Sequence, residues 1–259
     1  MISVFIITQN EEENIGDCVR ALSFADEIVV VDALSTDRTV EIARQLGARV
    51  YLRSWSGYTE QRNYAIEQCR GDWLVYMDAD ERPGEGFGDE VRALLTAGDK
   101  AADEAADAYW VSSREFFMGR FLRFGGYGLN QSNRKIRVWR RGSVRFVGEI
   151  HERAFTVGKT STFRSYIDHY SRAATVSGLV DQCNRYSDIE SLSDLRNGVN
   201  PSIRRLLWRP LKAFVSRFIV HQGCRDGLRG LIVAALRAHY FFLVEAKLLQ
   251  AARSPRSTS

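Results

Sequence analysis

The sequence lacks the cysteine spacing of a disulfide-rich or zinc-binding protein. Its cysteines form no CxxC pair and no close cluster, so we expect reduced thiols in a cytoplasmic protein; they are Cys18, Cys69, Cys183 and Cys224. No basic segment followed by an apolar run opens the chain, and we therefore expect no signal peptide. No stretch of 18 or more residues is free of charge, which argues against a conventional transmembrane helix.

Two phosphate-binding motifs are also absent. The chain contains no G-x-x-x-x-G-K-[ST] motif, and no G-x-G-x-x-G follows the first predicted strand. These absences exclude a Walker-type NTPase and an ordinary dinucleotide-binding Rossmann domain. If a nucleotide binds, it must be held by carboxylates, a metal ion and other side chains.

Composition and charge bound the organisation of the chain. With 259 residues, 45% of them hydrophobic and 26% charged, the chain is long enough for one large soluble domain or one domain plus an appendage. The net charge is −12 over residues 1–110, +7 over 111–202 and +9 over 203–259. The acidic part suits a metal ion, whereas the basic part suits phosphate, nucleic acid or an anionic membrane.

The first hundred residues alternate short apolar runs with segments of helical spacing. The predicted strands are Ile2–Ile7, Glu27–Asp32, Arg49–Arg53 and Trp73–Met77. The predicted helices are Glu11–Leu22, Asp37–Leu46 and Tyr58–Cys69. Such alternation predicts a parallel, doubly wound sheet. A helix over Ser171–Leu195 and a last helical region to about residue 252 are expected beyond it.

Polar clusters follow three of the predicted strands, at Thr8–Glu11, Asp32–Asp37 and Asp78–Asp80. Because ligands bind at the carboxyl ends of parallel strands, we expect these clusters to form one cleft. In extended chain, residues i and i+2 point the same way, so Asp78 and Asp80 can address one centre. Mg²⁺ is often held by one or two carboxylates together with substrate phosphates. The pattern predicts a divalent metal beside a nucleotide diphosphate.

The segments TQNEEENI, VVVDALSTDRTVEIA, QRNYAI and GDWLVYMDADE resemble the nucleotide-sugar half of family 2 glycosyltransferases over residues 1–82. Residues 110–155, in which an aromatic and basic stretch is followed by VGEIHER, resemble the branch that builds the bacterial lipopolysaccharide core. The resemblance implies the GT-A fold, a Rossmann-like α/β domain with a mostly parallel sheet. We expect this domain over residues 1–170, with a nucleotide-sugar half (1–110) and an acceptor half (111–170), and a helical C-terminal region over 171–259.

The resemblance also implies roles for the polar clusters and for the third predicted helix. The expected nucleotide-sugar pocket consists of Thr8, Asn10, Glu11, Asp32, Ser35, Asp37, Arg62, Asn63, Asp78 and Ala79. Within it, Asp32 would meet the base or ribose, and Asp80 would hold Mg²⁺ or Mn²⁺ with Asp78 beside it. For Arg62 and Asn63, a surface helix face without a ligand is the alternative.

An inverting sugar transfer needs a general base for the acceptor hydroxyl. The candidates are Glu149, His151 and Glu152; in a strand Glu149 and His151 share a face, and Glu152 points to the other. The resemblance favours the pair His151–Glu152, with Glu152 as the base. The choice between Glu149 and Glu152 stays open, as does a structural histidine flanked by two solvated carboxylates.

An aromatic and basic stretch, residues 114–145, suits an acceptor. Aromatic faces stack on sugars and arginines grip phosphates, so the acceptor-binding candidates are Phe117, Arg120, Arg123, Tyr127 and Arg137. Interleaved arginine and phenylalanine also occur in RNA-binding surfaces, but no RNP pattern is present, which disfavours nucleic acid.

The C-terminal region combines apolar residues with arginine and lysine at helical spacing, which is typical of a helix on a membrane surface. A packed helix with a solvated basic face is the alternative. We expect metal-dependent transfer of a hexose, glucose from UDP-glucose first, to a lipopolysaccharide core or other lipid-linked saccharide at the cytoplasmic face of the inner membrane. The rival functions are a polyprenyl-phosphate sugar synthase, a nucleotidyltransferase, and an RNA- or membrane-binding module with an inactive cleft.

Overall fold

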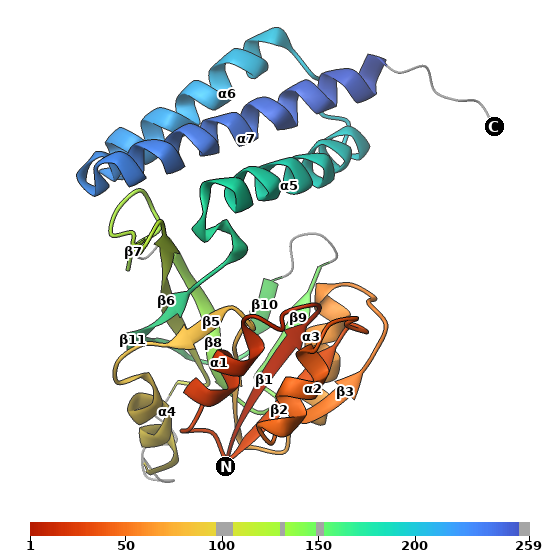
Figure 1. The fold of residues 1–259 in the computed structure, drawn as a ribbon, viewed down its shortest axis with the longest axis vertical. Coiled ribbons are helices and arrows are strands. Elements are labelled where there is room, and N and C mark those ends of the chain that lie inside the picture. The colour runs from red at the N-terminus through yellow and green to blue at the C-terminus, as the bar shows by residue number, and fades with distance from the viewer. Residues whose placement is uncertain (97–105, 130–132, 149–152, 254–259) are drawn as a thin grey trace, which may run out of the picture. The chain divides into compact units, whose positions relative to one another are not determined.

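The structure is a computed structural model that describes residues 1–96, 106–129, 133–148 and 153–253 (Figure 1). The chain divides into two compact units. One comprises residues 1–113 and 133–169, and the other comprises residues 114–132 and 170–259. The structure therefore groups part of the aromatic and basic stretch with the C-terminal helices.

The first unit is built on a mixed β-sheet. Its parallel strands are β1 (Ile2–Thr8), β2 (Glu27–Asp32), β3 (Arg49–Leu52) and β4 (Trp73–Tyr76). The sheet continues through β8 (Arg134–Arg140), β6 (Ala108–Phe117), β11 (Thr160–His169) and β5 (Glu81–Pro83). The order of these strands is β3-β2-β1-β4-β8-β6-β11-β5. The pairs β4–β8, β8–β6 and β11–β5 are antiparallel. This sheet confirms the predicted α/β class.

Helices cover both faces of the parallel strands. They are α1 (Ile15–Ala21), α2 (Thr39–Gln45) and α3 (Tyr58–Gln68), with α4 (Phe87–Thr96) following β5. Ile6 packs in one apolar cluster with Ile15 of α1, and Phe5 packs in a second cluster with Ala65 of α3. Because successive side chains of a strand point to opposite faces, β1 is buried at every position, and it is apolar except at Ser3 and Thr8. The two clusters are the core that positions the loops at the carboxyl ends of the strands.

A two-stranded hairpin is attached to α3. It consists of β9 (Val144–Val147) and β10 (Arg153–Thr156), whose ends pair through Val147 and Arg153. Asn63 of α3 donates to the carbonyl of Phe146 at 3.0 Å and accepts from its N–H at 2.9 Å. The candidate catalytic residues Glu149, His151 and Glu152 lie outside the described residues.

The second unit is mainly helical. Its described elements are β7 (Arg120–Phe121), η3 (Arg172–Ala174), α5 (Val176–Arg196), α6 (Ile203–Val215), η4 (Ser216–Val220), η5 (Gly223–Asp226) and α7 (Leu228–Arg253). Glu245 of α7 is fully buried and forms ion pairs with Arg205 and Arg209 of α6. Burial opposes its ionisation, but these two arginines hold the pKa of Glu245 below its usual range.

The segment that precedes these helices in the chain packs on them. Phe117 lies in an apolar cluster with Leu122 and with Val233 of α7. The carboxylate of Asp226 accepts hydrogen bonds from the backbone N–H groups of Arg123 and Phe124. No helix in the described part of the chain is long and apolar enough to cross a membrane.

Candidate active site

The loops after β1 and β2 are tied together by side chains that bond to backbone. Asp32 is fully buried, and its carboxylate accepts a hydrogen bond from the Ser35 N–H at 2.7 Å and another from the Ser35 hydroxyl. The Ser35 oxygen in turn accepts from the N–H of Asn10 at 2.8 Å, and the Asn10 side chain accepts from the N–H of Thr36 at 2.9 Å. Asn10, Asp32 and Ser35, which were all expected in the nucleotide-sugar pocket, therefore lie next to one another in the structure.

Asp37 connects the second loop to the first. Its carboxylate accepts from the N–H of Thr39 at 3.0 Å and from the N–H of Glu12 at 3.1 Å. Burial opposes ionisation of Asp37, but these bonds lower the pKa of the carboxyl below its usual value. The N–H groups of Glu11 and Glu12 bond to the side chains of Thr39 and Asp37, and the first helix begins at Ile15, not at Glu11 as expected.

Thr8 ends β1 directly opposite Asp32 of β2. Its side chain is buried, and its hydroxyl oxygen has no hydrogen-bond partner among the described residues. A buried hydroxyl without a partner costs about 1–3 kcal/mol and therefore fits a position that a bound ligand completes.

Asp78 follows β4 at the centre of a charged cluster. The Tyr76 hydroxyl donates to one oxygen of Asp78 and accepts from Nη2 of Arg62 at 2.7 Å. The guanidinium of Arg137, on β8, lies 3.5 Å from the other oxygen and also pairs with Glu81. Glu81 accepts the N–H of Asp78 at 2.9 Å, which holds the loop in place.

These contacts set the charges of the cluster. Burial opposes ionisation of Asp78, but Arg137 and Arg62 outweigh it and hold the pKa of Asp78 well below its usual range. Burial raises the pKa of Glu81 despite Arg137, and the charge of Asp78 adds to that rise. Burial also raises the pKa of Tyr76, which remains a neutral hydrogen-bond donor.

Tyr76→Phe tests the hydroxyl that joins Arg62 to Asp78. We expect the free energy of unfolding to fall by about 1–3 kcal/mol, because the buried Arg62 and the partly buried Asp78 each lose a hydrogen bond. Urea denaturation measures this loss. Tyr64→Phe on α3 is the matched control, with an expected change within about 0.5 kcal/mol; equal losses in both variants would contradict the arrangement.

Asp80 points to a different partner. One of its carboxylate oxygens lies 3.2 Å from Nε2 of His169, at the end of β11, and the two side chains are 21% and 25% exposed. The antiparallel pairing of β11 with β5 sets His169 opposite Glu81, one residue from Asp80. Sequence reasoning did not single out His169, since 89 residues separate it from Asp80.

Asp80 and His169 supply one oxygen and one nitrogen donor. No group of three or more histidine, cysteine or acidic side chains that could hold a metal occurs in the part of the chain that the structure describes. The pair fits Mg²⁺ or Mn²⁺ if diphosphate oxygens and water complete the shell. Asp78 instead faces Tyr76 and Arg137, so the two aspartates have different partners where a single centre was expected.

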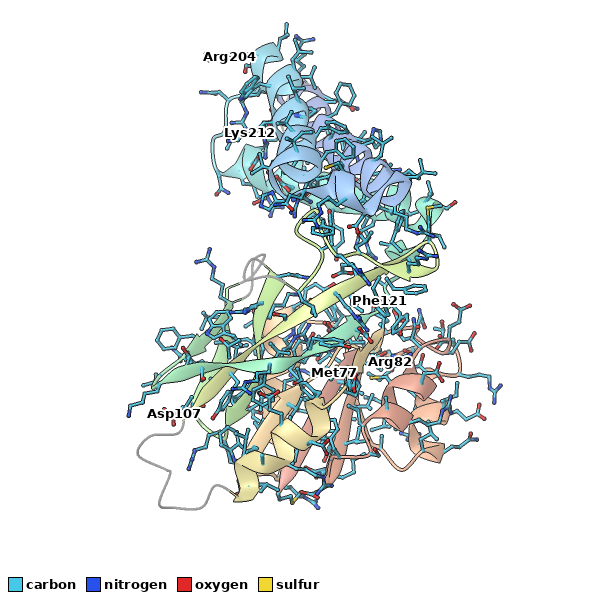
Figure 2. All side chains as sticks on the ribbon, turned by 90° about the vertical axis from the view of Figure 1, so that its left-hand side faces the viewer. Met77, Arg82, Asp107, Phe121, Arg204 and Lys212 are labelled. Carbon is cyan, nitrogen blue, oxygen red and sulfur yellow. The ribbon has the colours of Figure 1, made fainter. Side chains whose placement is uncertain are left out.

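The turn between the two aspartates is supported by Arg82. Its guanidinium donates to the carbonyl of Ala79 and to the carbonyl of Asn14, each at 3.0 Å. Ala79 is itself buried. Met77 and Arg82, which flank the Asp78–Glu81 segment, are labelled in Figure 2.

Several predicted binding residues have structural partners. Arg62 is 8% exposed and lies over the rings of Tyr76 and Phe146, with its guanidinium carbon 4.6 and 5.2 Å from their centroids. Asn63 uses both ends of its amide on the backbone of Phe146. Arg62 reaches the site through Tyr76, whereas Asn63 holds the β9–β10 hairpin.

The acceptor candidates fall into two groups. Arg137 and Phe117 are each 2% exposed. Arg137 lies in the Asp78 cluster, and Phe117 lies in the core of the helical unit. Both were expected to contact the acceptor, but neither presents a surface to it. Burial raises the pKa of Tyr127, whose ring contacts Arg217. Arg120 and Arg123 have exposed side chains. An aromatic and basic pattern does not distinguish buried from exposed arginines.

Acidic loops tied together at the carboxyl ends of parallel strands define an enzyme of the nucleotide-binding α/β class. The sequence model of the family described as glycosyl transferase family 2 matches residues 3–146, more than half of the chain. The chain therefore belongs to glycosyl transferase family 2 and is a glycosyltransferase, which confirms the family that its motifs predicted.

Relatives extend the similarity. The chain is 29% identical over 260 residues to the lipopolysaccharide core biosynthesis glycosyltransferase LpsC of Rhizobium meliloti, covering 96% of this chain and 92% of LpsC. It is 41% identical over 86 residues to the low-salt glycan biosynthesis hexosyltransferase Agl6 of Haloferax volcanii, covering 30% of this chain and 21% of Agl6. A structure of glucosyl-3-phosphoglycerate synthase from Mycobacterium tuberculosis with Mn²⁺ and UDP is 26% identical, with 44% of each chain covered and a TM-score of 0.36.

Proposed function

We propose that the enzyme transfers a hexose, glucose from UDP-glucose first, to a hydroxyl of a lipopolysaccharide core or other lipid-linked saccharide. The similarity to LpsC along almost the whole chain supports this acceptor class. The observation that carries the chemistry is the pair Asp80–His169 beside the Asp78 cluster. The reaction takes place at the cytoplasmic face of the inner membrane, where the protein is peripheral.

The donor nucleoside binds between the loops after β1 and β2. The buried Asp32 carboxylate is oriented by Ser35 and accepts hydrogen bonds from the base or ribose. The hydroxyl of Thr8 has no other partner in the described part of the chain, and it bonds to the same nucleoside. Asn10, Glu11 and Asp37 complete the pocket wall.

Asp80 and His169 would hold Mg²⁺ or Mn²⁺ together with oxygens of the donor diphosphate. When bound, the ion neutralises charge that develops on the leaving UDP. Asp78 stays ionised and is held in place by Tyr76 and Arg137, so it faces the ribose or the sugar without moving.

Glu152 is the proposed general base. It removes the proton of the acceptor hydroxyl while that oxygen bonds to the anomeric carbon, and the bond to the UDP oxygen breaks, which inverts the configuration. The described residues flanking its segment are anchored to α3. Thr59 donates to the carbonyl of Gly148, and Asn63 holds Phe146. Arg62, on the same helix, reaches Asp78 through Tyr76.

Glu152→Gln tests the base. We expect kcat to fall by about 100-fold or more, while KM for the donor changes little, because proton removal fails and donor binding does not. Glu149→Gln is the matched control on the same segment, with a fall below about fivefold. If Glu152→Gln keeps its turnover and Glu149→Gln loses it, Glu149 is the base. If both variants keep their turnover, the nucleophile is already ionised, as in a polyprenyl-phosphate sugar synthase, and the hydroxyl acceptor is wrong.

The function itself is tested by incubating the purified chain with UDP-glucose and a lipopolysaccharide core that lacks its outer sugars. We expect UDP release and one added glucose of inverted anomeric configuration, measured by NMR of the product. Release of pyrophosphate would identify a nucleotidyltransferase instead.

A further inference from the structure

Helix α6 and the short π-helical segment η4 that follows it carry a line of exposed apolar side chains. These residues recur every four positions, and we call them the α6 stripe: Ile203, Leu207, Leu211, Val215 and Ile219. They are exposed by 67%, 68%, 54%, 41% and 57%, in that order. A spacing of four residues keeps side chains on one slowly turning face of a helix. Trp208, 60% exposed, lies beside them.

The opposite face of α6 is the one that packs within the unit. Arg205 and Arg209 point to the buried carboxylate of Glu245 on α7, and Ala213 is buried. The stripe is therefore not the helix's internal packing face. A contiguous apolar surface of this kind marks a site of interaction with a partner or a membrane.

The charges around the stripe are of one sign. Residues 203–225 contain six arginines and lysines and no aspartate or glutamate. Arg204 and Lys212, both exposed and both labelled on α6 in Figure 2, have no acidic partner within the described residues, whereas Arg205 and Arg209 are paired. An apolar face with unpaired cations is complementary to an anionic surface that has an apolar interior.

We propose that the α6 stripe binds an anionic phospholipid bilayer, with the apolar side chains at the acyl boundary and Trp208, Arg204 and Lys212 at the headgroups. The proposal rests on the proposed function, because a lipid-linked acceptor requires a membrane, and it assigns the attachment to one surface. A second copy of this chain fits the stripe poorly, since a two-fold interface would set the same cations against each other.

Sedimentation of the 259-residue chain with lipid vesicles tests the proposal. We expect binding to an equimolar mixture of phosphatidylglycerol and phosphatidylcholine, and at least about tenfold weaker binding to phosphatidylcholine alone. Arg204→Gln/Lys212→Gln should weaken binding to the anionic vesicles about 30-fold at low salt. Leu207→Ser/Leu211→Ser should weaken it by at least about tenfold at any salt concentration, because insertion depends on the apolar face.

Matched variants control for charge and for apolar area. Arg44→Gln/Arg196→Gln removes two exposed cations elsewhere, and Ile189→Ser/Leu192→Ser removes two exposed apolar side chains of α5. Both controls should bind vesicles within about threefold of the wild-type protein. Equal losses in stripe and control variants, or equal binding to both kinds of vesicle, would overturn the proposal.

Two further readouts separate the outcomes. Analytical ultracentrifugation without lipid should show no self-association through the stripe. If the wild-type protein self-associates, Leu207→Ser/Leu211→Ser abolishes that association and no vesicle binding occurs, the stripe binds a second copy and the proposal is overturned. Stabilisation by UDP and Mn²⁺ should be the same in the stripe variants and the wild-type protein. A wild-type protein that binds UDP but does not bind anionic vesicles rejects the stripe proposal alone, whereas a wild-type protein without UDP binding rejects the proposed function.

Discussion

Replacing Asp80 by asparagine should lower glycosyl transfer by about 1,000-fold or more and leave the fold intact. The side chain is partly exposed and pairs with His169, so its replacement removes little packing. Asparagine keeps the shape of the side chain but removes the charge that a divalent cation needs. The measurement is kcat/KM for UDP-glucose over a range of Mn²⁺ concentrations, with urea denaturation as the check on folding.

His169→Gln should act in the same direction with a smaller loss, about 30-fold, and should raise the Mn²⁺ concentration required for half-maximal activity. Asp89→Asn, an exposed carboxylate of α4, is the control and should change neither quantity. Transfer by Asp80→Asn at the wild-type rate, with unchanged dependence on Mn²⁺, would remove Asp80 and His169 from the site.

Replacing Arg137 by methionine should lower the free energy of unfolding by about 3–5 kcal/mol at neutral pH. The guanidinium is 2% exposed and pairs with Asp78 and with the equally buried Glu81. Removing one member of a buried ion pair leaves the other charge without compensation, and methionine preserves most of the side-chain volume. Chemical denaturation at several pH values measures the loss.

The pH dependence of this loss has a defined sign. In the wild-type protein the folded-state pKa of Asp78 is depressed, so its contribution to stability is present above its unfolded pKa of about 4 and is lost as pH falls through the folded pKa. The difference between Arg137→Met and wild type should therefore shrink below about pH 4.

Glu81→Gln added to Arg137→Met should restore part of the loss. Arg140→Met, an exposed position on the same strand, should cost less than about 1 kcal/mol, and an equal cost would contradict a special role for Arg137.

The parallel half of the sheet was predictable because β1, β2 and β4 are largely buried on both faces, although β3 is only partly buried. Glu27–Asp32 was predicted with its observed bounds, and the strands beginning at Ile2, Arg49 and Trp73 end within one residue of the prediction. An uninterrupted apolar run of this length between turn residues leaves few alternatives. The first helix was predicted to begin four residues too early and to end one residue too late; side chains from the next loop bind the backbone of Glu11 and Glu12.

The contacts of the site were less predictable, since they depend on antiparallel pairing. Asp78 and Asp80 were identified from the strand that precedes them. Arg137 and His169 reach them only because β8 pairs with β4 and β11 pairs with β5, over 59 and 89 residues of sequence. The aromatic and basic pattern did not indicate that Arg137 is a buried ion-pair partner. The choice of Glu152 as the base stays a prediction.

The central claim is a metal-assisted site for a uridine diphosphate sugar. Thermal unfolding of the wild-type chain with UDP, GDP, CDP, ADP or TDP, each with and without Mn²⁺, tests it most directly. We predict stabilisation by UDP that requires Mn²⁺, about 2.7 kcal/mol at roughly 100 times the dissociation constant, and no such effect in Asp80→Asn. An absence of stabilisation by every nucleotide, or stabilisation by UDP that is the same without metal and in the variant, would contradict the account.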